Sequence, residues 1–323
     1  FEDVQIGDTI SDPEHRTQMP RIVVEQPTIK ITFRVNDSPF AGRAGKWVTS
    51  RHVKDRLERE AKRNIALRVD MTSEPDQFVV SGRGELMLSI LAETMRREGY
   101  EFAIGMPEVV TKEEDGVTYE PVERVVVDIP DAYVGAVTTR LGERRGQMLK
   151  LLTPTHGRSR LEFRVSSRGL IGFRSTFLTE TRGTGLLNTL FDGWEPMGAV
   201  MLRRPSGAII SDRTGIATPY ALFHVQPRGV LFIDPSTDVY EGMVVGEHNR
   251  PQDLDVNVCR EKKLTNIRAA GRDENVILSP PKRLTIELAM ELVDRDELVE
   301  ITPDSVRIRK RILDGNKRPR RDD

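Results

Sequence analysis

The residues best placed to do chemistry in this sequence are clustered cations. Between Cys259 and Arg272, five basic residues stand beside one acid, and between Arg307 and Arg321 eight stand beside one acid. A third, weaker group lies between residues 140 and 160. Because the formal net charge of the 323 residues is only -1, these groups reflect local segregation of charge.

Clustered cations indicate a polyanionic partner, because each neutralised phosphate releases counterions. For any one cluster alone, a solvated face or a disordered tail is an equally good interpretation. Three clusters on an otherwise neutral chain favour nucleic acid. The predicted RNA-binding residues are Arg260, Lys262, Lys263, Arg268, Arg272, Arg307, Arg309, Lys310, Arg311, Arg140, Arg144 and Arg145.

The aromatic content favours one mode of RNA recognition over another. Aromatic residues make up 6% of the chain and do not alternate with the basic residues in sequence. Stacking of single-stranded bases on aromatic rings is therefore not the expected mode. Recognition of structured RNA through its shape and backbone fits better.

Catalytic signatures are missing from the sequence. No phosphate-binding loop, dinucleotide fingerprint, H-E-x-x-H, C-x-x-C or G-x-S-x-G motif occurs. The five histidines are scattered, and Cys259 lies beside Arg260, where its thiol pKa could be lowered, yet no partner base is evident. We therefore predict no catalytic, cofactor-binding or metal-binding residue.

One motif occurs twice. Phe78 to Leu91 reads FVVSGRGELMLSIL, and Phe163 to Thr176 reads FRVSSRGLIGFRST. Backbone amides at Gly84 and Gly169 could hold an anion where a strand gives way to a helix. The favoured alternative is that glycine serves only the tight turn and close packing, so the repeat indicates a duplicated domain.

Hydrophobic periodicity places elements around each copy in the order β-α-β-β-α-β, which is typical of a ferredoxin-like unit. Thr49 or Ser50 is the expected N-cap of one helix, and Asp131 that of another. In the first copy, strands are expected at 29–35, 67–71, 78–81 and 100–110, with helices after 50 and from 84 to 99. In the second, strands are expected at 125–129, 148–152, 161–165 and 186–194, with helices at 131–142 and 171–183 and a charged loop at 111–116.

After Met197 the pattern changes to short β segments, expected at 199–202, 208–211, 220–225, 229–233 and 243–246. A basic loop at 253–274, one helix around Leu288 and a strand through Ile308 follow, and a basic tail ends the chain. The predicted fold class is α+β, with two ferredoxin-like domains followed by a β-rich C-terminal domain with one helix. The predicted limits are 1–26 for the remnant of a preceding β-barrel and its linker, 27–110 and 111–196 for the two domains, and 197–323 for the third.

Composition limits the cellular compartments in which the protein is expected. The single cysteine excludes an internal disulfide and fits a reducing, cytoplasmic compartment. No apolar run approaches the ~18 to 20 residues that span a bilayer, so no membrane association is expected. Because the chain opens on Phe1 without an initiator Met, it is expected to be a piece of a longer protein.

The motifs resemble a known family. SGRGELMLSIL is similar to the third domain of elongation factor G type translational GTPases, and Pro130 to Met148 resembles their fifth domain. Elongation factor G has a further domain where this chain has only Thr111 to Tyr119. The block from Arg250 to Leu313 closely resembles the C-terminal domain of the BipA (TypA) GTPases.

The resemblance implies a monomeric, cytoplasmic protein that binds the 70S ribosome, large-subunit rRNA and the tRNA acceptor arm through loop 253–274. It also implies roles in large-subunit assembly, stress responses and virulence. GTP and Mg²⁺ would be held by an upstream GTPase domain, so no cofactor is expected in this chain. Two alternatives remain open: a ligand-binding regulatory module built on paired ferredoxin-like domains, and a hydrolase that uses Cys259.

Overall fold

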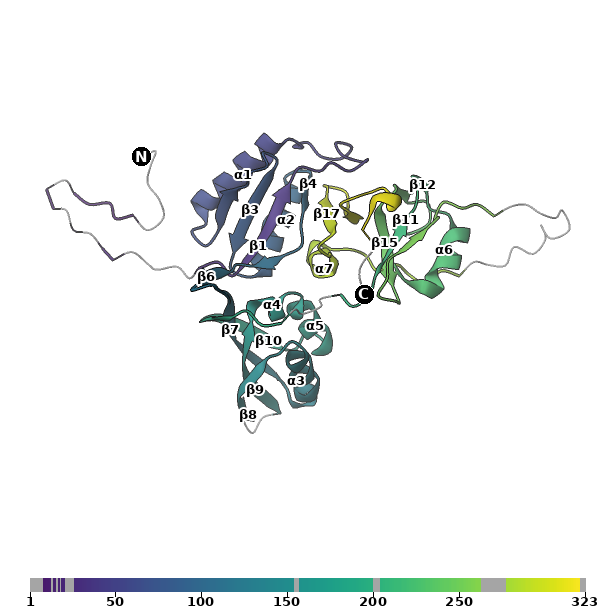
Figure 1. The fold of residues 1–323 in the computed structure, drawn as a ribbon. Helices are drawn as coiled ribbons and strands as arrows, with labels where there is room; N and C mark the ends of the chain where they lie inside the picture. The colour runs from purple at the N-terminus through teal and green to yellow at the C-terminus, as the bar shows by residue number, and fades with distance from the viewer. Residues whose placement is uncertain are drawn as a thin grey trace. The chain divides into compact units, whose positions relative to one another are not determined.

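A computed structural model of the chain (Figure 1) describes residues 8–12, 14, 15, 17, 19, 20, 26–153, 157–199, 204–262 and 277–319. The chain divides into two compact units. The first comprises residues 1–35, 46–102 and 107–201, and the second comprises 36–45, 103–106 and 202–323.

The first unit begins with one copy of the predicted β-α-β-β-α-β order. The elements of this copy are β1 (Ile29–Arg34), α1 (Ser50–Arg63), β2 (Arg68–Met71), β3 (Gln77–Gly82), α2 (Glu85–Arg97), β4 (Phe102–Ile104) and β5 (Glu108–Val109), and of β4 only Phe102 belongs to the first unit. β1 pairs antiparallel with β3, and β3 with β2. Along β1 the buried residues alternate, and Phe33 stacks on Phe102 with ring centroids 5.5 Å apart. The period-2 pattern therefore identified the core face of this sheet.

Local chemistry sets where α1 begins and which face it buries. The Thr49 hydroxyl accepts a hydrogen bond from the His52 amide, which confirms Thr49 as the N-cap. α1 buries Val53, Leu57 and Arg56. The Arg56 guanidinium is paired with Glu98 and Glu60 at 2.6 and 2.8 Å, so its burial leaves no unmatched charge.

The second ferredoxin-like copy also lies in the first unit, with sheet order β10-β7-β9-β8. Its elements are β6 (Lys112–Glu114), β7 (Val117–Pro130), the 3-10 turn η1 (Asp131–Tyr133), α3 (Val134–Glu143), β8 (Gln147–Leu152), β9 (Arg158–Ser166), α4 (Ser167–Leu170), α5 (Phe173–Glu180) and β10 (Leu186–Pro196). Val137 and Leu141 of α3 and Phe173 and Phe177 of α5 share one core with the inward residues of the strands. Both helices therefore cover the same face of this sheet (Figure 1).

Two local expectations in this copy were wrong, and one helix is shorter than expected. The helix expected at 171–183 is α5, which begins only at Phe173 because Gly172 has a left-handed φ of 72°, and the short helix α4 precedes it. The charged loop at 111–116 is a hairpin, in which β6 pairs with β7. Asp131 makes no capping bond, because its carboxylate accepts a hydrogen bond from the Ser159 hydroxyl.

The repeated glycines serve two different structural purposes. Gly84 precedes α2 with φ 78° and ψ 166°, a region of backbone space that other residues essentially never adopt. Gly169 lies in α4, where an added Cβ would stand 2.9 Å from the Arg144 carbonyl oxygen. One glycine is required by the turn and the other by close packing, so the geometry of both supports a structural role.

The second unit contains a mixed sheet in which β16, β11, β15, β18 and β17 are successive neighbours, and β13 pairs with β15. Its elements are β11 (Ala208–Ser211), β12 (Gly215–Ile216), α6 (Pro219–Val225), η2 (Gln226–Arg228), β13 (Gly229–Leu231), β14 (Asp238–Val239), β15 (Met243–His248), β16 (Leu254–Val256), α7 (Ile286–Leu292), β17 (Glu297–Ile301), β18 (Val306–Lys310) and η4 (Gly315–Lys317). Phe40, which comes from far earlier in the sequence, packs edge-on against Tyr240 in the core of this unit.

The segment expected as a strand at 220–225 is the helix α6, so this unit has two α-helices in its described part rather than one. Thr218 caps the helix, since its hydroxyl accepts a hydrogen bond from the Ala221 amide. Pro219 occupies the first helical turn, where its missing N–H is harmless. The capping signal was present in the sequence and outweighed the β-forming composition of Tyr220 to Val225.

Gly84→Ala is expected to lower the free energy of unfolding by about 1 to 3 kcal/mol, because alanine is strained at a positive φ with an extended ψ. The matched control is Gly135→Ala in the exposed part of α3, where an added Cβ meets nothing within 4 Å. That variant is expected to gain about 0.5 to 1 kcal/mol from helix propensity. Urea denaturation measures both, and equal stability of the Gly84 variant and the parent would contradict the assignment.

Candidate nucleic-acid interface

Several of the predicted RNA-binding cations lie in a buried ionic network of the second unit. β17 and β18 pair antiparallel, so that Glu297 stands opposite Lys310 and Glu300 stands opposite Arg307. Directly opposed residues in an antiparallel ladder have Cβ atoms about 4.5 to 5.5 Å apart, which suits opposite charges. The acids of β17 therefore neutralise cations that the sequence placed in a basic cluster.

Lys310 is at the centre of the network. Its side chain is 1% exposed, and Nζ lies within ion-pair distance of Asp253, at 2.7 Å from Asp296 and at 3.0 Å from Glu297. Burial alone would lower the pKa of Lys310, but Glu297 and Asp253 outweigh it, and the pKa lies above its ordinary value. The Arg204 guanidinium is 2.8 Å from Glu297, so this carboxylate is shared by two buried cations.

Glu300 organises the other end of the same strand pair. Its carboxylate accepts hydrogen bonds from Arg307 at 2.8 Å, from the Tyr240 hydroxyl at 2.7 Å and from Ser38 at 2.9 Å. Burial would raise the pKa of Glu300, but the hydrogen bonds and the charge of Arg307 hold it below its ordinary value. Asn36 also donates to this carboxylate, at 3.0 Å.

Arg309 completes the set of buried cations. Its side chain is 2% exposed, and its guanidinium pairs with Asp37. Arg307, Arg309 and Lys310 are thus committed to carboxylates of their own unit and present no open cationic surface here. For Arg309 and Lys310 the expectation of direct phosphate contact is corrected: a charge buried among carboxylates is neither accessible nor in excess.

The cations of the second ferredoxin-like domain have mixed roles. Arg140 is exposed on α3 and pairs with Glu180 at 2.9 Å and with Glu143 at 3.3 Å. The half-buried Arg144 donates to the carbonyl oxygens of Gly169 and Ile171, both at 2.9 Å, and therefore fastens α3 to the turn before α5. Arg145 is exposed and makes one long hydrogen bond, of 3.4 Å, to a backbone carbonyl.

The described part of the basic loop carries exposed cations. Arg260 and Lys262 are exposed, as is Arg311 beyond the end of β18. Lys263, Arg268 and Arg272, predicted on the same loop, lie outside the described residues, as do Arg320 and Arg321 of the tail. The RNA-binding role of all these residues stays a prediction.

The chain on either side of residues 263–276 is held by specific hydrogen bonds. The Thr218 hydroxyl donates to the Arg260 carbonyl oxygen at 2.6 Å, just before this segment. After it, the Gln226 amide group donates to the Ile277 carbonyl and accepts from the Ser279 amide. Because Thr218 and Gln226 flank α6, this short helix holds the chain both before and after residues 263–276.

The catalytic interpretation of Cys259 loses its electrostatic basis. Burial raises the pKa of the Cys259 thiol and outweighs the opposing effect of Arg213, where the adjacent Arg260 had suggested a lowered value. Among the residues that the structure describes, no cluster of three or more His, Cys, Asp or Glu side chains could hold a metal ion. None of the helices in the described ranges combines the length and apolar character needed to span a bilayer.

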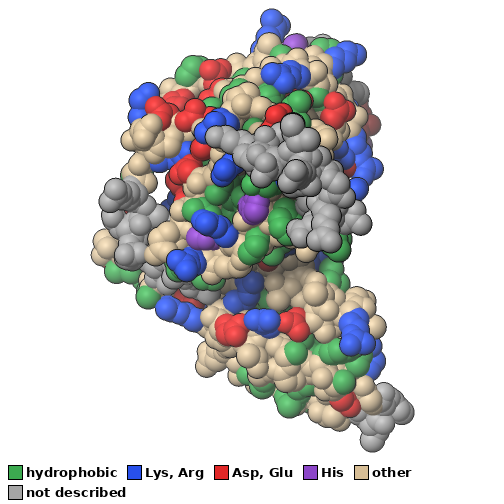
Figure 2. Space-filling view, turned by 90° about the vertical axis from the view of Figure 1, so that its right-hand side faces the viewer, with side chains coloured by type: hydrophobic (Ala, Val, Ile, Leu, Met, Phe, Trp, Pro, Cys, Tyr) green, Lys and Arg blue, Asp and Glu red, His purple; other side chains and the backbone are tan. Residues whose placement is uncertain are grey.

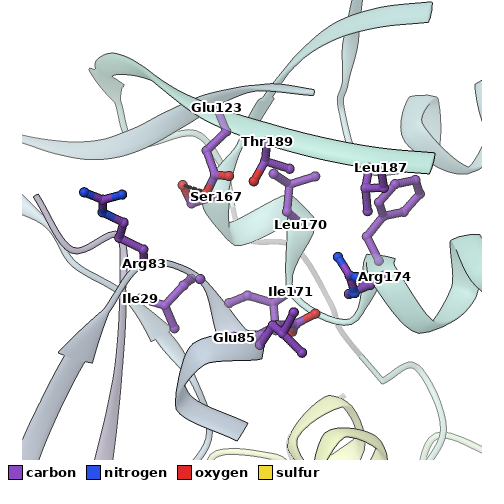
Figure 3. Close-up of a pocket in the computed structure, with 13 residues that line it drawn as sticks. Ile29, Arg83, Glu85, Glu123, Ser167, Leu170, Ile171, Arg174, Leu187 and Thr189 are labelled. Atoms are coloured by element: carbon purple, nitrogen blue, oxygen red, sulfur yellow. Dashed lines mark hydrogen bonds between the residues drawn. The ribbon is translucent and has the colours of Figure 1, made fainter. Parts of the chain in front are cut away.

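The first unit contains a cavity of about 200 Å³ where its two ferredoxin-like domains meet (Figure 3). Arg83 and Arg174 lie at opposite sides of it, and the Ser167 hydroxyl donates to Glu123 at 2.7 Å. Across the junction, the Gly172 amide donates to Glu85 at 2.7 Å. The repeated turns therefore face each other at this junction.

Two family models match the chain. Residues 117–205 match the elongation factor G C-terminus, and residues 206–315 match the TypA/BipA C-terminal domain. The first match and the ferredoxin-like order of the elements together show that the chain has the architecture of a translation factor. The second is specific, and the chain belongs to the TypA/BipA family.

The relatives cover almost the whole chain. It is 51% identical over 96% of its length to a large ribosomal subunit assembly factor BipA of Synechocystis sp., covering 52% of that protein. It is 46% identical over 98% of its length to the Bacillus subtilis (strain 168) protein of the same name, again covering 52%, and 48% identical to the Salmonella typhimurium protein, covering 53%. The chain thus spans about half the length of these relatives.

Glu297→Gln is expected to destabilise the second unit by about 3 to 5 kcal/mol, because it removes the anion shared by the buried Arg204 and Lys310. Urea denaturation monitored by far-UV circular dichroism measures the change. Asp304→Asn, an exposed change after the same strand, is the control and should stay within about 0.5 kcal/mol of the parent. A loss of less than about 1 kcal/mol would contradict the central role of Glu297.

The Glu300 network predicts a pH dependence. Because the folded-state pKa of Glu300 is lowered, its contribution to stability is complete above the unfolded-state pKa of about 4.3 and is lost as pH falls through the folded value. The difference in unfolding free energy between the parent and Glu300→Gln should therefore be constant from neutral pH to about pH 5 and shrink below about pH 4. A difference that does not change down to about pH 3 would contradict this role.

Proposed function

We propose that this chain is a ribosome- and RNA-binding part of a TypA/BipA-type translational GTPase that acts in assembly of the large ribosomal subunit. The observation that carries the proposal is the similarity to proteins named large ribosomal subunit assembly factor BipA, at 46 to 51% identity over at least 96% of this chain. The charge distribution agrees with it, because the cations Arg260 and Lys262 of the basic loop are exposed.

The proposed partners follow from the same family. The chain would contact large-subunit rRNA and, in the 70S ribosome, the tRNA acceptor arm through the basic loop. It would act as a cytoplasmic monomer, with roles in stress responses and virulence belonging to the whole protein. GTP and Mg²⁺ would be bound by another part of that protein, since the sequence contains no phosphate-binding loop.

The test is the salt dependence of binding to purified large ribosomal subunits. The double variant Arg260→Ala, Lys262→Ala is expected to bind more weakly, with the slope of log K against log salt reduced by about 1 to 2, or roughly 1 per lost phosphate contact. The matched control is Arg51→Ala, Lys54→Ala, which removes two cations from α1 that pair with acids of the same helix. Sedimentation at several salt concentrations gives both slopes.

Equal slopes for the parent and the loop variant would show that Arg260 and Lys262 do not contact ribosomal phosphates. An equal decrease for the loop variant and the α1 control would show that only the total charge matters. Failure of the parent chain to bind any ribosomal particle would overturn the proposed function for this chain.

The alternative is a regulatory module that binds a small molecule. The cavity between the ferredoxin-like domains favours it by position and by the two arginines at its sides. Its volume of about 200 Å³ is below the ~300 to 1,000 Å³ usual for ligand pockets, so RNA binding remains the first choice. A thermal-shift screen of anionic metabolites tests the alternative, and stabilisation that Arg174→Ala abolishes would support it.

A further inference from the structure

The helix α6 exposes aromatic rings that its own fold does not use. Ala221, Leu222 and Val225 form its buried face. On the other side, Phe223 is 41% exposed, His224 is exposed and Tyr220 is half-buried. One exposed apolar side chain alone is ordinary on a protein surface, whereas several adjoining ones can mark a contact site.

The three rings form one cluster. His224 lies edge-to-face against Tyr220, with ring centroids 4.5 Å apart, and against Phe223 at 5.7 Å. Such contacts fix the orientation of the rings, so the surface is ordered before any partner binds. We refer to Tyr220, Phe223 and His224 as the α6 aromatic face.

The α6 aromatic face lies within the basic part of the second unit. Thr218, at the start of the helix, holds the backbone of Arg260, and Gln226, at its end, holds Ile277. Arg228, exposed in η2, follows directly. Figure 2, which views the side of the molecule that carries α6, shows hydrophobic side chains and a histidine exposed beside Lys and Arg side chains.

We propose that the α6 aromatic face is a stacking site for unpaired RNA bases, with Arg260 and Arg228 neutralising the adjoining phosphates. The inference rests on the proposed RNA-binding function and adds a second mode of recognition to it. Aromatic rings beside cations suit single-stranded RNA, because every base has a π-face and every nucleotide carries one charge. A paired helix hides its base faces, so the site distinguishes unpaired from paired RNA.

The surrounding charge decides between RNA and a protein partner. Exposed arginines stand at both ends of α6, Arg260 beside its start and Arg228 after its end, and this local excess of positive charge favours a phosphate-bearing partner. This arrangement is not evident from the sequence, because Tyr220 and Arg260 are far apart in the chain. Hydrogen bonds from Thr218 to the carbonyl oxygens of Val258 and Arg260 bring them to one surface.

The test compares binding of a fluorescein-labelled oligoadenylate with binding of a labelled blunt RNA duplex, by fluorescence anisotropy. Phe223→Leu, which stays apolar but has no ring, is expected to weaken oligoadenylate binding about fivefold or more and to leave duplex binding unchanged. Phe223→Tyr keeps a ring and should retain the parent affinity. Val230→Ala, at a site 48% exposed on β13, is the control for loss of exposed apolar surface.

Each other result overturns the stacking site. If Phe223→Leu binds oligoadenylate as well as the parent does, the α6 aromatic face takes no part in RNA recognition. If Phe223→Leu loses affinity equally for oligoadenylate and for the duplex, the loss does not come from base stacking. Loss of ribosome binding with both RNA affinities intact assigns the face to a protein partner. If the parent binds neither RNA nor ribosomes, the proposed function itself fails. If Arg260→Ala, Lys262→Ala weakens binding but Phe223→Leu does not, only the stacking site fails.

Discussion

The pairing of charges across β17 and β18 is the interaction on which the second unit depends. Four ionisable residues, Glu297, Glu300, Arg307 and Lys310, lie in two opposed pairs on neighbouring strands. Breaking one such buried pair typically costs about 3 to 5 kcal/mol, a large share of the ~5 to 15 kcal/mol of a domain's stability. The network also reaches Asp253, the first residue of the basic loop, so the ladder that stabilises the unit holds the origin of that loop.

This arrangement divides the cations into two kinds. Lys310 and Arg309 are buried among carboxylates of their own unit, while Arg260 and Lys262 are exposed beside a helix with uncovered aromatic rings. The electrostatic field available to a polyanion comes from the exposed residues, because buried pairs cancel at short range. The proposed RNA interface is therefore the exposed part of the basic loop and α6 rather than the final strand.

The sequence predicted the order of elements well and the use of charge poorly. Period-2 alternation at Ile29, Ile31 and Phe33, and the repeated Ser-x-Arg-Gly turn, were local signals, and local signals locate strands and turns. The pairing of Glu300 with Arg307 depends on strand register, and the contact of Ser38 with Glu300 joins positions 262 residues apart. A count of cations in a window along the chain cannot include acids that arrive on a neighbouring strand. The acids of DELVEI, seven to fourteen residues before their partners, were nevertheless a hairpin signal that the count overlooked.

The most direct measurement is lysine acylation footprinting of the chain alone and in complex with large ribosomal subunits, quantified at Lys262 and Lys310 by mass spectrometry. Lys310 is expected to be unreactive in both states, because it is buried among three carboxylates. Lys262 is expected to react in the free chain and to be protected in the complex. Equal reactivity of Lys262 in both states, or a reactive Lys310 that becomes protected on the ribosome, would contradict the division of the cations.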